Sequence, residues 1–273
     1  MFDKISLAGD LGSGKSTVSA ILIDRLGAEY YSTGAIVRSI AEAHGMTVVE
    51  LNKYMETHPE IDHEIDDGLK ALSSLDKQLI IDSRMAWYFT EGTFKVYLSC
   101  DIETSAARIM AANRQGEHAA SFEETVKQTR ARRESEKKRY MEQYGQDIKD
   151  LMNYALIVDT TNATPAEVAD CIIAAYRAWQ ADKSYRAAFI SSKRLNFFDD
   201  EIDADELSAA CAKVELGECD TEISVFERDG EFYVADGNTA AVASSILNDG
   251  YIRATLVPAG DISRGYVKMK NSL

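Results

Sequence analysis

The sequence of 273 residues predicts an α/β fold in which a parallel sheet is flanked by helices on both faces. Two observations predict this fold. Short apolar runs alternate with segments of helical periodicity over roughly the first 180 residues. A glycine-rich turn also lies between the strand-like run Lys4–Ala8 and the helical pattern of Lys15–Leu26. A polar break at Ala181–Ser184 ends this alternation, and we expect a small α+β domain after it.

The other elements of the first part follow in order. Three short apolar runs are expected to be buried strands: Gln78–Asp82, Phe94–Leu98 and Tyr154–Val158. A helix should begin soon after the last of them, because Thr164-Pro165-Ala166-Glu167 combines an N-cap threonine, a first-turn proline and a glutamate two positions beyond it. We expect this helix to continue through Trp179.

Residues Gly9–Ser16 match the phosphate-loop pattern GxxxxGK[ST] in full, between a predicted strand and a predicted helix. The glycines allow successive backbone N–H groups to face one anion, and the following helix adds its positive end. Lys15 is placed to reach the β- and γ-phosphates, and Ser16 to ligate Mg²⁺. We therefore expect a P-loop NTPase fold that binds ATP and Mg²⁺. The expected nucleotide-binding residues are Gly12, Ser13, Gly14, Lys15, Ser16 and Thr17.

Charge and the remaining motifs narrow the class of P-loop protein. The sequence has 45 acidic and 30 basic residues, a net charge of -15, which disfavours nucleic acid and anionic membranes as partners. No apolar segment is long enough to span a bilayer, and the four widely spaced cysteines fit a reducing, cytoplasmic setting.

The sequence lacks the NKxD segment with which a GTPase reads guanine. Helix-rich insertions between short strands favour a kinase that closes a lid over a small-molecule substrate.

Two groups of residues are candidates for a second anion site. Ser32-Thr33-Gly34 ends a predicted strand, and Arg38 follows one helical turn later; the alternative is a helix N-cap with a surface arginine. Asp82-Ser83-Arg84 follows an apolar strand, at the edge of the sheet where ligands bind in open α/β folds. The alternative for this group is a strand-end salt bridge. We expect Asp82 to position substrate or a water molecule of Mg²⁺.

The segment Arg130–Arg139 has six basic residues among its ten, in an otherwise acidic protein. On a helix, Arg130, Arg133 and Lys137 share one face. Phosphoryl transfer needs cations around the moving charge, and arginine suits phosphate oxygens geometrically. The alternative is a solvated, salt-bridged helix. Because the chain has a phosphate loop, we favour a lid in which Arg130 and Arg133 are catalytic together with Lys15.

These motifs, in this order, resemble the cytidylate kinases, in particular the compact archaeal type. The stretches that carry the resemblance are Gly9–Thr17, Tyr31–Arg38, His58–Asp66, Asp82–Arg84, Arg133–Glu136, Arg139-Tyr140 and Tyr144–Ile148. The resemblance implies ATP-dependent phosphorylation of CMP or dCMP. It implies that Thr33, Arg38 and Arg84 hold the nucleoside monophosphate. It further implies that Arg130 and Arg133 close over the transferred group.

Two residues depart from the pattern of that family. Asp82-Ser83-Arg84 stands where the family usually has Glu-Gly-Arg, which keeps the charges but loses a glycine beside the substrate. Asp10 stands where proline is common, and an extra carboxylate near the phosphates could bind a metal-bound water. Kinase chemistry is therefore the expectation, with cytosine specificity left open.

The C-terminal part is expected to be a separate domain, residues 190–273, after a kinase-like domain at residues 1–183. Its expected elements are a helix at Asp205–Lys213, strands at Glu222–Phe226 and Phe232–Ala235 joined by a turn at Asp229-Gly230, a helix at Thr239–Leu247 and a strand at Ala254–Val257. The stretch Phe232–Asn238 resembles the ParB/sulfiredoxin-like fold. Active members continue this turn with a basic pair, whereas Thr239 and Ala240 follow here. We therefore favour a regulatory or interaction module with a protein partner.

Three alternatives stay open at this point. The acceptor could be another small molecule selected by the C-terminal domain. The chain could instead be a nucleotide sensor that regulates a partner, with ATP binding and no acceptor turnover. A DNA-partitioning role, suggested by the ParB-like stretch, predicts salt-dependent DNA binding, and the charge balance argues against it.

Overall fold

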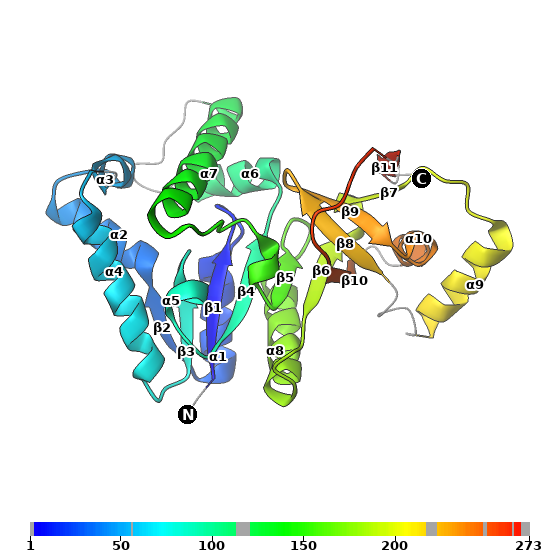
Figure 1. The fold of residues 1–273 in the computed structure, drawn as a ribbon, viewed down its shortest axis with the longest axis horizontal. Helices are drawn as coiled ribbons and strands as arrows, with labels where there is room; N and C mark the ends of the chain where they lie inside the picture. The colour runs from blue at the N-terminus through cyan, green and yellow to red at the C-terminus, as the bar shows by residue number, and fades with distance from the viewer. Residues whose placement is uncertain are drawn as a thin grey trace.

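The computed structural model describes residues 3–55, 57–112, 121–216, 223–247, 250–263 and 265–268. Its strands pair into one mixed sheet in the order β11-β7-β9-β8-β10-β6-β5-β4-β1-β3-β2 (Figure 1). In chain order the strands are β1 (Lys4–Gly9), β2 (Glu29–Ser32), β3 (Leu79–Asp82), β4 (Thr93–Ser99), β5 (Leu156–Asp159), β6 (Ala187–Ser191), β7 (Leu195–Phe198), β8 (Ser224–Arg228), β9 (Glu231–Asp236), β10 (Tyr251–Leu256) and β11 (Tyr266–Lys268).

Helices connect most of these strands. They are α1 (Lys15–Leu26), α2 (Thr33–Ala43), α3 (Val48–Met55), α4 (Pro59–Ala71), α5 (Ala86–Phe89), α6 (Ile102–Ala111), α7 (Phe122–Tyr144), α8 (Pro165–Ala181), α9 (Ala204–Glu215) and α10 (Asn238–Leu247). Short 3₁₀ turns lie at Leu72–Ser74, Leu151–Asn153 and Ser192–Arg194. None of the helices in the described ranges combines the length and the apolar character needed to cross a membrane.

The predicted parallel sheet with helices on both faces is confirmed. Strands β2, β3, β1, β4, β5 and β6 run parallel to their neighbours. Alternate residues of each strand face opposite sides, so Ile5 and Leu7 of β1 pack in the cluster that contains α1 and α8. Ala8, on the other face, packs in a cluster with Trp87 of α5. Strand β1 lies between β3 and β4, which places the phosphate loop at a point where the strand order reverses.

Local signals predicted the elements best. Helix α1 spans the predicted residues, and the capping box of α8 is present, with Thr164 and Glu167 exchanging both of its hydrogen bonds. The predicted strand at Tyr154 is wrong at its start, because β5 begins only at Leu156. Tyr154 instead closes a 3₁₀ turn, where its N–H donates to the carbonyl of Leu151, and its buried side chain satisfies the apolar pattern without strand geometry.

The C-terminal part extends the same sheet. Strand β10 pairs antiparallel with β6, and the predicted hairpin joins β8 to β9 through Asp229 and Gly230, which both have positive φ (55° and 85°). One hydrophobic cluster contains Tyr97 and Ile157 of the first part together with Phe197 and Val234 of the second. The division into residues 1–183 and 190–273 stays a prediction.

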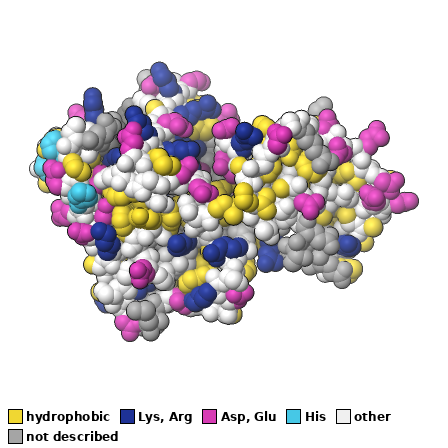
Figure 2. Space-filling model, viewed as in Figure 1, with side chains coloured by type: hydrophobic (Ala, Val, Ile, Leu, Met, Phe, Trp, Pro, Cys, Tyr) yellow, Lys and Arg dark blue, Asp and Glu magenta, His cyan; other side chains and the backbone are white. Residues whose placement is uncertain are grey.

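The other predicted C-terminal elements appear with shifted ends. The two helices are α9 and α10, the strand before the hairpin is Ser224–Arg228, and the last predicted strand is Tyr251–Leu256. Glu222, at the start of one predicted strand, lies outside the described residues. Acidic side chains gather at the end of the molecule formed by α9, whose N-cap is Asp203 (Figure 2).

Candidate functional site

The phosphate loop connects the end of β1 to the start of α1. Gly14 is the N-cap of α1 and has a φ of 82°, so the first N–H groups of the helix point into the loop. A Cβ atom added to Gly9 would lie 2.4 Å from the carbonyl oxygen of Leu98, whereas one on Gly14 would meet no atom within 4 Å. Ser16 and Thr17 are exposed on the first turn of α1. The predicted residues Gly12–Thr17 thus lie together on this loop and the first helical turn, here called the cradle, and their binding of an anion stays a prediction.

Lys15 is folded back over this cradle. Its Nζ donates hydrogen bonds to the carbonyl oxygens of Gly9 (3.0 Å) and Asp10 (2.8 Å). Burial and the nearby Arg84 guanidinium lower the pKa of Lys15 to about 7, against the opposing effect of Asp82 and other carboxylates. The ammonium group is thus held at the loop by backbone carbonyls rather than by a carboxylate.

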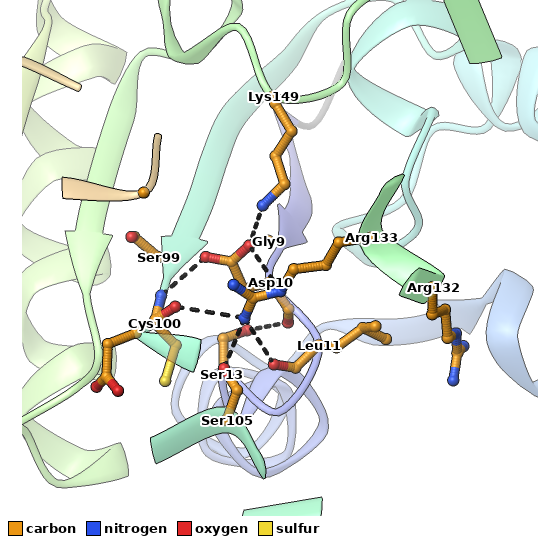
Figure 3. Close-up of polar contacts among 12 residues, drawn as sticks. Gly9, Asp10, Leu11, Ser13, Ser99, Cys100, Ser105, Arg132, Arg133 and Lys149 are labelled. Atoms are coloured by element: carbon orange, nitrogen blue, oxygen red, sulfur yellow. Dashed lines mark hydrogen bonds and ion pairs between the residues drawn. The ribbon is translucent and has the colours of Figure 1, made fainter. Parts of the chain in front are cut away.

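Asp10 does not face the cradle, which corrects the expectation that it would bind a metal-bound water. Its carboxylate accepts hydrogen bonds from the hydroxyl of Tyr97 (3.0 Å) and the N–H of Cys100 (2.9 Å), and it pairs with Lys149 (Figure 3). Burial alone would raise the pKa of Asp10, but Lys149 and Arg133 hold it well below its usual range. The Asp10 carboxylate is therefore directed toward β4 and is already engaged by groups of the protein.

Arg133 of α7 reaches the phosphate loop. Its Nη2 donates to Ser105 Oγ (2.7 Å) and to the carbonyl oxygen of Leu11 (3.5 Å), and its Nε lies 3.7 Å from Asp10 Oδ1. Figure 3 shows Arg133 pointing toward the loop, while its neighbour Arg132 points away. Helix α7 therefore already holds one of the two predicted lid arginines at the loop.

The other predicted lid residue, Arg130, is exposed on the same helix. Arg130, Arg133 and Lys137 line one cleft of about 1100 Å³, which confirms that they share a helix face. The opposite wall of the cleft comes from the C-terminal part and includes Glu227 and Gly230 of the β8–β9 hairpin. Arg130 thus faces solvent between the two parts of the chain, one turn of α7 away from Arg133.

The predicted acceptor residues lie at the ends of β2 and β3. In the sheet, Ser32 of β2 lies opposite Asp82 of β3, and Asp82 lies opposite Leu7 of β1. The ends of β2 and β3 are therefore near the end of β1, where the phosphate loop begins. The Thr33 hydroxyl donates to the Asp82 carbonyl (3.5 Å), and Tyr30 donates to the Asp82 carboxylate (3.1 Å). Arg38 is exposed on α2, whose N-cap is Ser32. Both the N-cap and the exposed arginine of the alternative interpretation are therefore present.

Arg84 takes part in an ion pair, though not with Asp82 of its own strand end. Its Nε donates to Glu136 of α7 (2.9 Å), and its Nη1 donates to the carbonyl oxygen of Gly9 (2.8 Å). Burial alone would raise the pKa of Glu136, but Arg84 and Arg132 lower it to about 2. Arg84 thereby ties α7 to the phosphate loop, with its guanidinium beside Lys15.

A pocket of about 260 Å³ adjoins the phosphate loop on its other side. Its lining includes Gly14, Thr17, Arg108, Thr160, Ala163 and Pro165. Arg108 Nη2 donates to the carbonyl of Thr160 (2.7 Å), which holds the loop after β5 against α6. Sequence reasoning missed Arg108, Glu136 and Lys149. Arg108 and Lys149 are single basic residues without a local pattern, and their roles depend on contacts across the fold.

Comparisons with known proteins agree with this geometry. Residues 4–162 match the cytidylate kinase-like family. The chain belongs to this family. This membership, with the names of the relatives below, supports a nucleoside monophosphate kinase, an enzyme class that fits the phosphate loop and the cationic groups around it. The family match ends in the loop after β5, so the C-terminal part lies outside it. The resemblance of that part to the ParB/sulfiredoxin-like fold stays a prediction.

Several relatives are similar over most of their own length. The cytidylate kinase of Sulfurisphaera tokodaii is 38% identical over 174 residues, covering 63% of this chain and 93% of the relative. The cytidylate kinase of Haloarcula marismortui is 35% identical over 195 residues, which cover 71% of this chain and 99% of the relative. An S-adenosylmethionine-dependent nucleotide dehydratase of Lacinutrix mariniflava is 34% identical over 178 residues, which cover 65% of this chain and only 36% of that protein.

Proposed function

We propose that this kinase transfers the γ-phosphoryl group of ATP to CMP or dCMP. The observation that carries the proposal is the placement of three cationic side chains at the carboxyl end of β1. Lys15, Arg84 and Arg133 come from α1, the end of β3 and α7, and each contacts the backbone of residues 9–11. The pocket beside Arg108 adjoins the loop after β5, and β3 and β2 lie on the other side of β1 in the sheet, so a donor and an acceptor could reach the phosphate loop from different sides.

The donor side fits a nucleoside triphosphate. The cradle Gly12–Thr17 offers N–H groups and a helix N-terminus to the phosphates, and the adjoining pocket of about 260 Å³ is large enough for part of a nucleoside. The exposed hydroxyl of Ser16 would hold Mg²⁺, which neutralises phosphate charge when bound. Arg108 lines this pocket and is a candidate to contact the base.

The acceptor side would use Thr33, Arg38, Asp82 and Arg84. Arg38 is exposed and able to swing toward an incoming phosphate, while the Asp82 carboxylate is available for a ribose hydroxyl or a water. An acceptor phosphate oxygen would attack the γ-phosphorus in line, forming a new P–O bond as the bond to ADP breaks. The phosphate of the acceptor is already a nucleophile, so no general base is needed. Lys15, Arg130 and Arg133 would neutralise the charge on the transferred group.

The test is a coupled ADP-release assay with ATP and a panel of CMP, dCMP, UMP, AMP and non-nucleotide acceptors. We expect the highest kcat/KM with CMP or dCMP, and a loss of about 10³-fold in Lys15→Ala, because one cationic donor at the transferred group is removed. Higher turnover of a non-nucleotide acceptor would support the alternative of a different small-molecule kinase. ATP binding and slow hydrolysis with no acceptor turnover would contradict the proposal and support the nucleotide sensor.

A further inference from the structure

The loop after β5 is part of the donor pocket, and it is held from two sides. On the inner side, Arg108 of α6 donates to the carbonyl of Thr160 (2.7 Å) and to its hydroxyl (3.2 Å). On the outer side, the Thr161 N–H and hydroxyl donate to Asp159 Oδ1 at 3.0 and 2.6 Å. The position of Thr160 and Ala163 in the pocket therefore depends on where the Asp159 carboxylate is held.

Asp159 is completely buried, and its charge is balanced by a residue far along the chain. Arg194 Nη1 donates to Asp159 Oδ1 (2.9 Å) and to Ser99 Oγ (3.1 Å), at the ends of β5 and β4. The Arg194 side chain is itself only 7% exposed, against 0% for Asp159. Its Nη2 donates to the carbonyl oxygen of Gly230 in the β8–β9 turn (2.5 Å). One guanidinium thus joins the donor-pocket loop to the C-terminal hairpin.

Two further contacts connect the same loop to residues beyond the family match. Asn162 Nδ2 donates to Ser191 Oγ at the end of β6 (2.9 Å), and the hydroxyl of Tyr251 donates to the carbonyl of Asp159 (2.7 Å). The family match ends at residue 162, so Ser191, Arg194 and Tyr251 all belong to the additional part of the chain. The predicted acceptor residues lie at or soon after the ends of β2 and β3, the strands on the other side of β1 in the sheet.

We propose that Arg194 is a positioning residue for the donor nucleotide, through which the C-terminal part of the chain sets the shape of the donor pocket. Arg194 holds Asp159, Asp159 holds Thr161, and the loop so fixed presents its pocket-lining residues beside the phosphate loop. The inference rests on the proposed function, in which ATP occupies this pocket. It assigns the C-terminal part a role in donor binding rather than in acceptor choice.

The experiment measures ATP binding directly, by titration of the full chain with a fluorescent ATP analogue, and the KM values for ATP and CMP in the coupled assay. We expect Arg194→Met to weaken ATP binding about tenfold and to leave the KM for CMP within about twofold, since misplacing a positioning loop costs affinity only at its own subsite. Arg194→Lys keeps the charge beside Asp159 and should recover part of the loss. The matched control is Arg228→Met. Arg228 lies on the hairpin that Arg194 contacts, but it donates to the Gly260 carbonyl within the C-terminal part.

A milder variant covers the case in which Arg194→Met does not fold. Ser191→Ala removes one hydrogen bond to Asn162 without exposing a charge, and we expect it to weaken ATP binding about two- to threefold. Unchanged ATP binding in a folded Arg194→Met, or an equal rise in both KM values, would overturn the inference. If Arg194→Met is unfolded, unchanged ATP binding in Ser191→Ala would overturn the inference instead. Failure of the wild-type chain to bind ATP would overturn the proposed function itself, and the inference with it.

Discussion

The Lys15 side chain shows how the phosphate loop changes the chemistry of a single residue. Its Nζ is held by two backbone carbonyls rather than by a carboxylate, and burial together with Arg84 lowers its pKa to about 7. A triphosphate bound at the loop would bring negative charge to the ammonium group and raise this pKa again. Donor binding should therefore be coupled to protonation of Lys15.

This coupling predicts proton uptake when ATP binds. At pH 8 most of the free chain has a neutral Lys15, so binding takes up a proton, and ATP affinity falls as the pH rises above about 7. Calorimetric titration with MgATP at pH 8, in two buffers of different ionisation enthalpy, should give different apparent binding enthalpies. The difference should shrink at pH 6, where Lys15 is already charged. Equal enthalpies in the two buffers at pH 8 would contradict the prediction.

Sequence reasoning worked at the residue scale where a motif specifies both partners. Lys15 and the cradle Gly12–Thr17 are found where the GxxxxGK[ST] pattern places them. The pair Arg84–Glu136 joins residues 52 positions apart, and the sequence contains no local signal for it. The pairing of Asp10 with Lys149 has no local signal either, since the two residues meet only when the segment after α7 packs beside β4.

The phosphate loop and α6 meet at a glycine. A Cβ atom added to Gly12 would lie 2.6 Å from the carbonyl oxygen of Ser105 in α6. Gly12 and Gly14 both have positive φ, at 73° and 82°, but a Cβ on Gly14 would meet nothing within 4 Å. The two positions share the same backbone strain, and only one of them has a neighbouring element in close contact.

This pair predicts a difference in stability between two alanine variants. We expect Gly14→Ala to lower the free energy of unfolding by about 1 kcal/mol, the cost of a left-handed backbone at a side-chain-bearing residue. We expect Gly12→Ala to lower it by about 2–4 kcal/mol, because displacement of α6 adds to that strain. Urea unfolding of both variants measures the difference. Equal losses would show that the contact between the loop and α6 is unimportant.

Elements were predicted best where their ends carry their own signals. The capping box at Thr164 and the turn at Asp229-Gly230 place α8 and the β8–β9 hairpin, because both depend on neighbouring residues alone. The apolar pattern predicts a start of β5 at Tyr154, two residues too early, because a buried aromatic residue fits a strand pattern as well as a turn. Strands β6, β7 and β11 were not predicted, and each is a short segment paired to strands distant in sequence.

At the scale of the whole molecule, the two predicted domains share one sheet and one hydrophobic cluster. Strand β6 joins them, parallel to β5 and antiparallel to β10. The cluster packs Tyr97 and Ile157 of the first part with Phe197 and Val234 of the second, so the two parts bury apolar side chains together. Arg194 adds a buried ion pair across the same junction.

This arrangement predicts that the full chain unfolds in one transition. The two tryptophans, Trp87 and Trp179, lie in the first part, so their fluorescence reports on that part, while far-UV circular dichroism reports on both. We expect the two probes to give the same midpoint. A fragment of residues 1–183 should unfold at a lower temperature, because β5 loses its neighbour β6. Two separate transitions in the full chain would instead support independent domains.

The sequence by itself determined the class of this protein and the place of its phosphate loop. Strand–helix alternation, the glycine pattern and the helix caps are local features, and local backbone preferences suffice to specify them. Only the tertiary structure decided that Arg84 pairs with Glu136, that Asp10 turns toward Lys149, and that Arg194 reaches back to Asp159. These contacts join residues far apart in the chain, and they form because the sheet and its helices bring the ends of different strands to one edge.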